Sequence, residues 1–230
     1  MKYAKIELER DDVHKRFGGG IPYGSIIHIE GEESSGKSIL SQRLSYGFLQ
    51  NSYSLSYIST QSTTTEFVKQ MTSLKYMINK KLLNGNLLYI PVYPLISDNT
   101  QKDDFIKKSM TTRAFYEKDI IIFDCLSTLI SNDASEVQVG DLMSFLKRIA
   151  SMNKIIVYTI NPKELSDQVV TMLRTAATMV IKTETFSFGG NLKNSAKIVK
   201  YNMAAGPFQK VMVFRVDPGL GIAVEISSVA

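Results

Sequence analysis

The segment GEESSGKS, residues 31–38, constrains the fold of this chain more than any other part of its sequence. It matches the pattern Gly-x4-Gly-Lys-Ser, follows the apolar run SIIHIE directly, and leads into a helical window that begins at Lys37. A loop of this kind between a strand and a helix surrounds phosphate groups with backbone N–H groups and the helix N-terminus. We therefore predict a strand, a phosphate-binding loop and a helix in that order.

The residues of this phosphate loop (residues 31–38) have different expected roles. Gly31 and Gly36 allow the tight backbone path, and Lys37 neutralises charge on the β- and γ-phosphates. The side chains of the two acidic residues can point to solvent, because the loop backbone makes the phosphate contacts. ATP and Mg²⁺ are the expected cofactors, with the Ser hydroxyl placed on the metal. The candidate cofactor-binding residues are Gly31, Glu32, Glu33, Ser34, Ser35, Gly36, Lys37, Ser38 and Ile39.

Short apolar runs alternate with longer helical windows along the chain. The apolar runs are residues 26–30, 55–59, 87–92, 120–123, 155–160 and 179–182. The helical windows are residues 37–50, 66–78, 102–117, 139–150 and 163–173. Several runs are almost continuously apolar, which indicates strands buried on both faces. The alternation predicts βαβ units, and thus an α/β fold with a largely parallel central sheet flanked by helices.

The pattern changes after residue 195. Three strand-like runs follow, KIVKYNM, KVMVFRV and IAVEISS, and the turn sequences AAGPFQ and DPGLG separate them. We expect these runs to form an antiparallel strand extension at the edge of the sheet. Because no linker, repeat or shift in composition marks a boundary, residues 1–230 are interpreted as one domain.

The composition limits the chemistry that this chain can perform. One Cys and two His are too few for a structural zinc site, which needs about four ligands, and they exclude a disulfide framework. The lone Cys125 favours a reducing compartment. The N-terminal residues do not have the pattern of a signal peptide, and no stretch has the ~20 apolar residues of a membrane span. We therefore expect a cytoplasmic protein without direct membrane insertion.

The charge distribution is more informative than the net charge of +5. The segment between Glu184 and Asp217 contains basic residues and no acidic residue. One interpretation is an exposed basic face, and the other is a surface for a polyanion, a nucleotide phosphate or an acidic partner. The basic residues of this segment are Lys193, Lys197, Lys200, Lys210 and Arg215.

An aspartate follows the buried run 120–123. At the carboxyl end of a parallel strand, Asp124 points into the crevice where α/β folds bind ligands. We predict that it binds Mg²⁺ through water or orients Ser38, so Ser38 and Asp124 are the candidate metal residues. The alternative is an aspartate that only ends the strand. Cys125 is interpreted as a small buried residue, because no His lies nearby in sequence to activate it.

Four segments carry a resemblance to a known family. FGGGIPYGSIIHIEGEESSGKS, residues 17–38, resembles the opening of the RecA/KaiC superfamily of P-loop proteins. The segments YISTQSTTTEF, FDCLSTL and FRVDPGLGIAVEIS are similar to a KaiC-like ATP-binding family of the archaeal swimming motor, the archaellum. The similarity covers essentially the whole chain. It implies a RecA/KaiC-like core.

RecA/KaiC-type ATPases normally carry a glutamate, often as a Glu-Glu pair, where it orients and deprotonates the attacking water. The matching positions here are Gln61 and Ser62, and neither side chain can act as a base. Losing such a base costs on the order of 10²–10⁴ in rate. The nearest acid, Glu66, has the spacing of a capping box with Thr63. No catalytic residue is therefore assigned, and we predict an ATP-binding regulatory protein with little or no hydrolysis.

The resemblance also implies a ring-shaped homo-oligomer. KaiC-like rings present a Lys-x-Arg pair to the γ-phosphate held by the next subunit. The matching positions are Lys200 and Asn202, so the lysine remains and the arginine is missing. Lys200 is thus a candidate nucleotide contact, and its alternative interpretation is an exposed strand lysine.

The partners that the resemblance implies belong to the same motor. They are the motor ATPase and the membrane platform or ring scaffold proteins, with nucleotide state controlling assembly. Through them the protein would lie at the inner face of the cell membrane. No feature of composition or spacing identifies these partners.

Other functions stay open at this point. A working KaiC-like ATPase or autokinase would need another base, such as Glu136 or Asp133. A RecA-like recombinase paralogue would use the basic segment and a flexible loop at residues 187–195 to follow a phosphate backbone. The modest net charge makes nucleic acid an unfavoured partner. A vestigial, empty loop is the interpretation least compatible with so many competent binding residues.

Overall fold

The computed structural model describes residues 2–92, 105–131, 134–188 and 190–225. The helices are α1 Val13–Arg16, α2 Lys37–Gln50, α3 Thr64–Ser73, α4 Asn79–Leu83, α5 Phe105–Thr111, α6 Leu126–Ile130, α7 Glu136–Ser151 and α8 Asp167–Ala176, with 3-10 turns η1 Arg113–Tyr116 and η2 Pro162–Glu164. The strands are β1 Tyr3–Ala4, β2 Ile21–Pro22, β3 Ile26–Glu30, β4 Leu55–Ser59, β5 Leu87–Pro91, β6 Ile120–Asp124, β7 Ile155–Ile160, β8 Met179–Phe188, β9 Asn191–Tyr201, β10 Val211–Asp217 and β11 Gly221–Val224.

Within the described residues, nine strands form one sheet in the order β11-β10-β9-β8-β3-β7-β6-β4-β5. All pairs from β8 to β5 in this order are parallel. The pairs β8–β9, β9–β10 and β10–β11 are antiparallel. The predicted largely parallel sheet with a C-terminal antiparallel extension is therefore confirmed.

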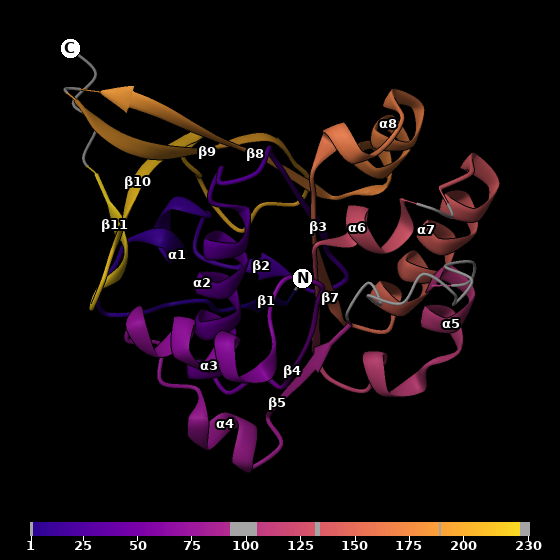
Figure 1. The fold of residues 1–230 in the computed structure, drawn as a ribbon, viewed down its shortest axis with the longest axis horizontal. Helices are drawn as coiled ribbons and strands as arrows, with labels where there is room; N and C mark the ends of the chain where they lie inside the picture. The colour runs from indigo at the N-terminus through magenta and orange to yellow at the C-terminus, as the bar shows by residue number, and fades with distance from the viewer. Residues whose placement is uncertain (1, 93–104, 132–133, 189, 226–230) are drawn as a thin grey trace.

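Helices cover both faces of the parallel part of the sheet (Figure 1). Ile27 and Ile29 of β3 pack into the core that contains α2 and α3, whereas Ile26 of the same strand packs into the core of α7 and α8. The apolar side of α7 faces this second core, with Val139, Leu142, Met143 and Leu146 buried and Ile149 partly buried. Strands buried on both faces explain the continuous apolar runs.

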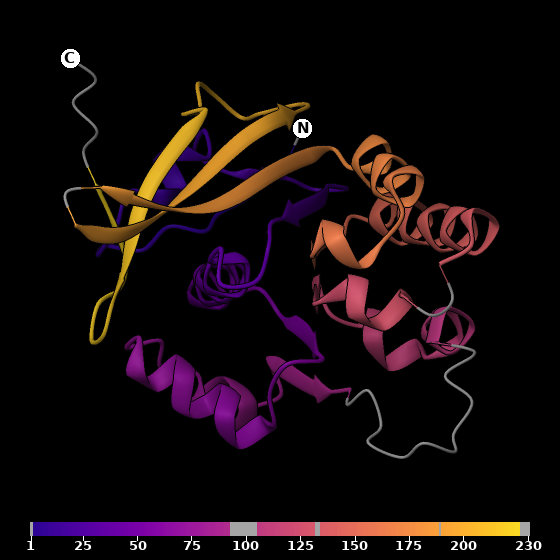
Figure 2. The same ribbon diagram turned by 45° about the horizontal axis from the view of Figure 1, so that its top comes forward.

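The antiparallel strands β9 to β11 extend the sheet beyond β8 and lie over the side of the sheet that α2 covers (Figure 2). Met212 and Phe214 of β10 and Ile222 of β11 belong to the same buried cluster as Leu40 and Leu44 of α2. This packing holds strands β10 and β11 next to α2, the helix that follows the phosphate loop.

Two helices have bounds that differ from those predicted for their windows. The window 66–78 is α3, which begins at Thr64 because Thr63 caps it, and which ends at Ser73 because Lys75 adopts a left-handed φ of 57°. The window 163–173 begins with η2, and α8 starts only after its N-cap, Ser166, whose hydroxyl accepts a hydrogen bond from Val169 N. Of the window 102–117, residues 102–104 lie outside the described residues, and the remainder forms α5 and η1.

The prediction of a flexible loop at residues 187–195 is wrong. β8 continues to Phe188 and β9 begins at Asn191, so most of this segment belongs to a hairpin whose ladder pairs Glu184 with Ser195 and Ser187 with Leu192. Lys193 in this hairpin forms an ion pair with Glu225 at 2.6 Å. The structure therefore does not support a flexible loop that follows a nucleic-acid strand at this position. Separately, no helix in the described part of the chain is both long and apolar enough to cross a membrane.

Candidate functional site

The phosphate loop lies between β3 and α2, as the sequence predicts. Gly36 is the N-cap of α2 and has a φ of 89°, a conformation that favours glycine. At Gly31, an added Cβ would lie 2.3 Å from Thr183 Oγ1 and 2.4 Å from Ser35 Oγ. These distances are shorter than any real contact of a Cβ. The backbone path of the loop therefore requires both glycines.

Lys37 occupies the first position of α2 and is buried. Its Nζ donates to the backbone oxygen of Glu32 at 2.6 Å, so the ammonium folds back into the loop. Burial lowers the pKa of Lys37, and the negative groups around it, including Asp124 and Glu164, act in the opposite direction. The loop thus holds one cation at the point where phosphate charge would gather.

Ser38 and Asp124 are brought together by the ends of α2 and β6. Ser38 Oγ donates to Asp124 Oδ1 at 3.0 Å, and Thr159 Oγ1 of β7 donates to the same oxygen at 2.6 Å. Tyr57 OH of β4 donates to Asp124 Oδ2 at 2.7 Å. Burial and the neighbouring carboxylate raise the pKa of Tyr57 well above its usual value, so it stays a donor. Three strands and a helix therefore fix the orientation of this buried carboxylate.

This pair of oxygen groups fits Mg²⁺. The ion prefers hard oxygen ligands and usually keeps several water molecules beside one or two protein oxygens and the substrate phosphates. Ser38 would ligate the ion directly, and Asp124 would act through water or through Ser38. Among the described residues, no group of three or more His, Cys, Asp or Glu side chains could hold a metal ion. The site is thus suited to an ion that arrives with a nucleotide.

Gln61 and Ser62, at the positions where related ATPases carry glutamate, point in different directions. Gln61 Oε1 lies 3.0 Å from Ser38 Oγ, beside the predicted metal site. Ser62 Oγ lies 3.1 Å from Tyr89 OH, and Tyr89 OH donates to the Ser62 backbone oxygen at 2.7 Å. Only the first of the two side chains reaches the metal site, and it is an amide without proton-accepting ability.

The capping box predicted for Thr63 and Glu66 is confirmed. Thr63 Oγ1 accepts from Glu66 N at 3.1 Å, and Glu66 Oε2 accepts from Thr63 N at 2.8 Å. The hydrogen bond from the Thr63 backbone N–H, together with the interaction of the Thr63 hydroxyl with the carboxyl, lowers the pKa of Glu66. The nearest acid in sequence to Gln61 is therefore engaged at the start of α3.

Glu32 and Glu33 are exposed, as expected for acidic residues in this loop. Glu32 Oε2 pairs with Lys163 Nζ, at the start of η2, at 2.6 Å. Glu33 belongs to the lining of the cavity that the loop borders. One acid thus ties the loop to the segment after β7, and the other lies at the cavity.

The loop borders a cavity of about 570 Å³. The antiparallel strands contribute to its wall through Asn194 of β9 and Val216 of β10. Sequence reasoning missed both residues, because nothing in their local pattern shows that these strands lie beside the loop. The lining residues are Glu33, Ser34, Ser35, Gly36, Lys37, Ser38, Ile39, Gln61, Asn194 and Val216.

Lys200 is not among the residues that line this cavity. Its Nζ contacts the backbone oxygens of Arg174 and Thr175, at the end of α8, at 3.4 and 3.1 Å. The single chain therefore does not bring Lys200 to the phosphate loop. A contact across a subunit boundary stays a prediction.

Glu136, another candidate base, is not placed at the cavity either. Glu136 lies in the first turn of α7 and does not line it, and Asp133 lies outside the described residues. Glu164 was missed by the sequence analysis. It influences Lys37 electrostatically, and its Oε2 accepts hydrogen bonds from Ser127 Oγ at 2.8 Å and Thr128 Oγ1 at 3.1 Å.

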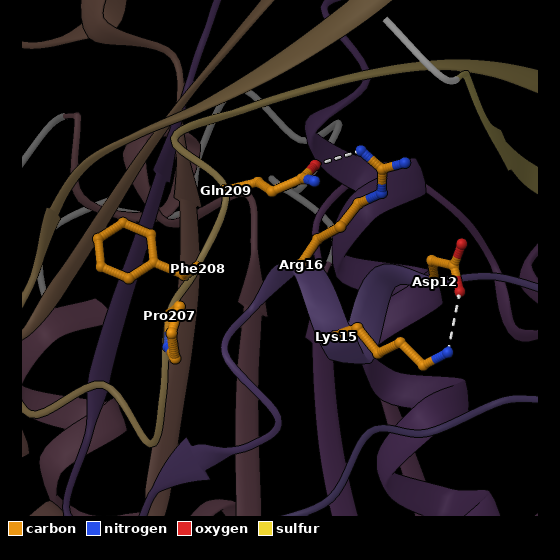
Figure 3. A pocket seen from close by; sticks show the side chains of 6 residues that line it. All are labelled: Asp12, Lys15, Arg16, Pro207, Phe208 and Gln209. Carbon is orange, nitrogen blue, oxygen red and sulfur yellow. Dashed lines mark hydrogen bonds and ion pairs between the residues drawn. The ribbon is translucent and has the colours of Figure 1, made fainter.

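A second cavity, of about 400 Å³, lies between α1 and the connection from β9 to β10 (Figure 3). Arg16 donates to Gln209 across it, and Lys15 pairs with Asp12 at 3.7 Å. Pro207 and Phe208 form the other side. The charged side chains that line this cavity thus each contact another residue of the same lining.

Comparisons with known proteins agree with this geometry. A family model described as ATPase: KaiC matches residues 11–226. The archaeal flagellar ATP-binding protein FlaH of Methanococcus voltae is 99% identical to this chain over 230 residues, 100% of each. The protein of the same name from Methanocaldococcus jannaschii is 68% identical over 100% of this chain and 99% of its own. The crystal structure of flagellar accessory protein FlaH from that organism has a TM-score of 0.94 at 68% identity, covering 98% of this chain and 100% of its own.

Proposed function

This chain belongs to the KaiC family of ATPases and, within it, to the archaeal flagellar ATP-binding proteins FlaH, and from this membership we propose that it is an ATP-binding regulatory component of the archaellum motor. It binds MgATP at the phosphate loop with little or no hydrolysis. The observation that carries the proposal is the joint placement of Lys37, Ser38 and Asp124 beside an amide, Gln61, where a hydrolytic site needs a carboxylate.

Binding rests on groups that are already in place. The N-terminus of α2 begins at Lys37, in the lining of the cavity, and the unpaired N–H groups and the dipole of a helix N-terminus favour negative charge. Lys37 exchanges its contact with the Glu32 carbonyl for phosphate oxygens. Ser38 would ligate Mg²⁺, with Asp124 acting through water or through Ser38, and the ion would supply positive charge that offsets the charge of the phosphates. The buried hydrogen-bond network around Asp124 keeps this pair oriented before the ligand arrives.

Slow hydrolysis is expected from the side chains that could act as a general base near the cavity. Gln61 can hold a water molecule through hydrogen bonds but cannot take its proton. Glu66 is engaged in its capping box, and Glu136 does not line the cavity. Glu33 lines the cavity, but the position beside Ser38 holds an amide, and without a base at that position proton transfer loses a contribution of about 10²–10⁴ in rate. The bound nucleotide therefore stays intact long enough to act as an assembly signal.

The proposed role in assembly rests on the coupling between nucleotide binding and the oligomeric state. A ligand that binds one state better than another stabilises that state in proportion to its differential affinity. We propose that MgATP held at one loop is contacted by Lys200 of a neighbouring subunit in a ring, and that this ring docks on the motor ATPase and on membrane platform or scaffold proteins at the inner face of the cell membrane. The similarity to FlaH proteins supports this proposal.

The proposal is tested by titrating the protein with MgATP while recording its oligomeric state. Lys37→Ala should weaken binding at least about a hundredfold, because the phosphates lose their charged partner, and should abolish nucleotide-dependent assembly. Lys200→Ala should keep binding to the isolated chain and reduce assembly. The control is Lys69→Ala, at an exposed position of α3. Assembly that proceeds equally with Lys37→Ala would contradict the coupling, and wild-type protein that binds no MgATP would contradict the function itself.

A further inference from the structure

Asn194 occupies a position at the phosphate loop that the nucleotide-binding motif does not account for. It lies on β9 and forms part of the wall of the cavity that the loop borders. Its side chain is packed closely against the loop, because a Cβ added to Gly36 would lie 3.4 Å from Asn194 Cγ. The side chain of a distant strand therefore borders the same space as the loop backbone.

The Asn194 amide contacts Thr185 on the neighbouring strand β8. Thr185 Oγ1 lies 2.9 Å from Asn194 Oδ1 and 2.9 Å from the backbone oxygen of Ser34. The hydroxyl has one proton and donates to one of these oxygens at a time, and the contact places the carbonyl side of the Asn194 amide next to Thr185. Its Nδ2 group makes no hydrogen bond to another described residue, and the half-buried side chain lines the cavity.

We propose that Asn194 is a phosphate-binding residue, whose Nδ2 donates a hydrogen bond to a phosphate oxygen of the nucleotide held by the loop. This inference rests on the proposed function. Asn194 lines the same cavity as the loop and packs beside Gly36, and Thr185, which contacts Asn194, also contacts the loop at Ser34, so a phosphate held by the loop would lie beside the Asn194 amide. Phosphate oxygens are strong acceptors, and an amide N–H₂ supplies the donors that they take.

The placement of Asn194 gives the antiparallel strands a direct role in binding. β9 and β10 pack on α2 through buried apolar side chains. A phosphate contact from β9 would add a polar link between the same two parts of the molecule. Nucleotide binding would then stabilise the hairpin β8–β9 as well as the loop.

The test uses Asn194→Asp in the full chain, with MgATP as the probe. This change keeps the oxygen that Thr185 contacts and replaces only the free N–H₂ group by an anionic oxygen. Repulsion of the phosphates should raise the Kd for MgATP by about tenfold to a hundredfold. The penalty should shrink as the pH falls from 8 toward 5, because the phosphates raise the pKa of the new carboxyl and protonation removes its charge.

Two further variants make the result specific. Asn194→Leu removes the donor without adding charge, and should raise the Kd by about three- to tenfold with no such pH dependence. Asn84→Asp is the matched control: its Oδ1 accepts a hydrogen bond from Asn86 N on an exposed turn before β5, and it adds the same charge away from the cavity. It should bind MgATP as the wild type does.

Several outcomes would overturn the assignment. One is an unchanged affinity in Asn194→Asp, and another is an equal loss in Asn84→Asp. If Asn194→Asp unfolds at a lower temperature than the wild type, the Kd of Asn194→Leu for MgATP becomes the test. A change of less than twofold in that Kd rejects the phosphate contact. Failure of the proposed function looks different, since the wild-type protein would then not bind MgATP at all.

Discussion

Gln61→Glu should convert this protein into a faster ATPase. Gln61 Oε1 lies 3.0 Å from Ser38 Oγ, so a glutamate of the same size would place a carboxylate beside the predicted metal and the γ-phosphate. A positioned general base contributes about 10²–10⁴ in rate, equivalent to about 3–5 kcal/mol of barrier. Asp124 also lies 3.0 Å from the Ser38 hydroxyl, and two nearby carboxylates repel each other. We therefore expect an increase at or below the lower end of this range, about ten- to a hundredfold.

The assay is multiple-turnover release of phosphate from MgATP at saturating nucleotide, with affinity measured in parallel. Ser62→Glu is the matched control, because the Ser62 hydroxyl contacts Tyr89 and not the metal site. It should leave turnover unchanged. The rate of Gln61→Glu should also rise with pH as the new carboxyl loses its proton.

Two results would refute the reasoning. If Gln61→Glu binds MgATP normally but hydrolyses it no faster, the missing carboxylate does not limit the rate. If Ser62→Glu accelerates hydrolysis equally, the side chain at position 61 is not the one that faces the attacking water.

Three further changes test the structure around the site by urea unfolding. Asp11→Asn should cost about 3–5 kcal/mol, since it leaves the buried Arg43 guanidinium, bonded through Nε at 2.7 Å and Nη2 at 2.6 Å, without its counter-charge; the exposed Asp12→Asn should be neutral. Burial raises the pKa of Glu30, but hydrogen bonds from His28 and Arg174 outweigh it and bring the pKa to about 2. Because this folded-state pKa is depressed, its stabilising effect is present above the ordinary value of 4.5 and is lost as the pH falls toward about 2. Glu30→Gln should therefore cost about 1–3 kcal/mol at pH 7, and a difference from the wild type that persists at pH 2 would contradict the ionic role. Thr63→Ala should cost about 1 kcal/mol through the lost cap without altering ATP turnover, and a change in turnover would give the start of α3 a role in hydrolysis.

The parallel part of the sheet could be predicted well because each strand is a buried apolar run with clear ends. Strands β3, β4 and β7 match the predicted runs at both ends, and α2 begins at Lys37 as the loop pattern requires. The position of Asp124 follows from the same rule, since a residue at the carboxyl end of a parallel strand faces the ligand side.

The antiparallel strands were harder to predict because only one of their faces is buried. In β8, Thr183 is buried whereas Glu184 and Thr185 are exposed, so the apolar run ends at residue 182 although the strand continues. The same mixture produced the wrong loop at residues 187–195. The place of β9 beside the phosphate loop follows from the strand order β9-β8-β3, a long-range property that no local pattern contains. Asn194 therefore became a site candidate only in the folded chain.

The central claim is that this chain holds MgATP and hydrolyses it slowly. The most direct measurement mixes excess wild-type protein with ATP labelled at the γ-phosphate, without partner proteins, and follows both bound nucleotide and released phosphate in one experiment. We expect ATP to be bound and recovered intact, with hydrolysis far below roughly 1 s⁻¹, a modest rate for an enzyme. Bound ATP that is cleaved at about 1 s⁻¹ or faster by the isolated chain would contradict the account.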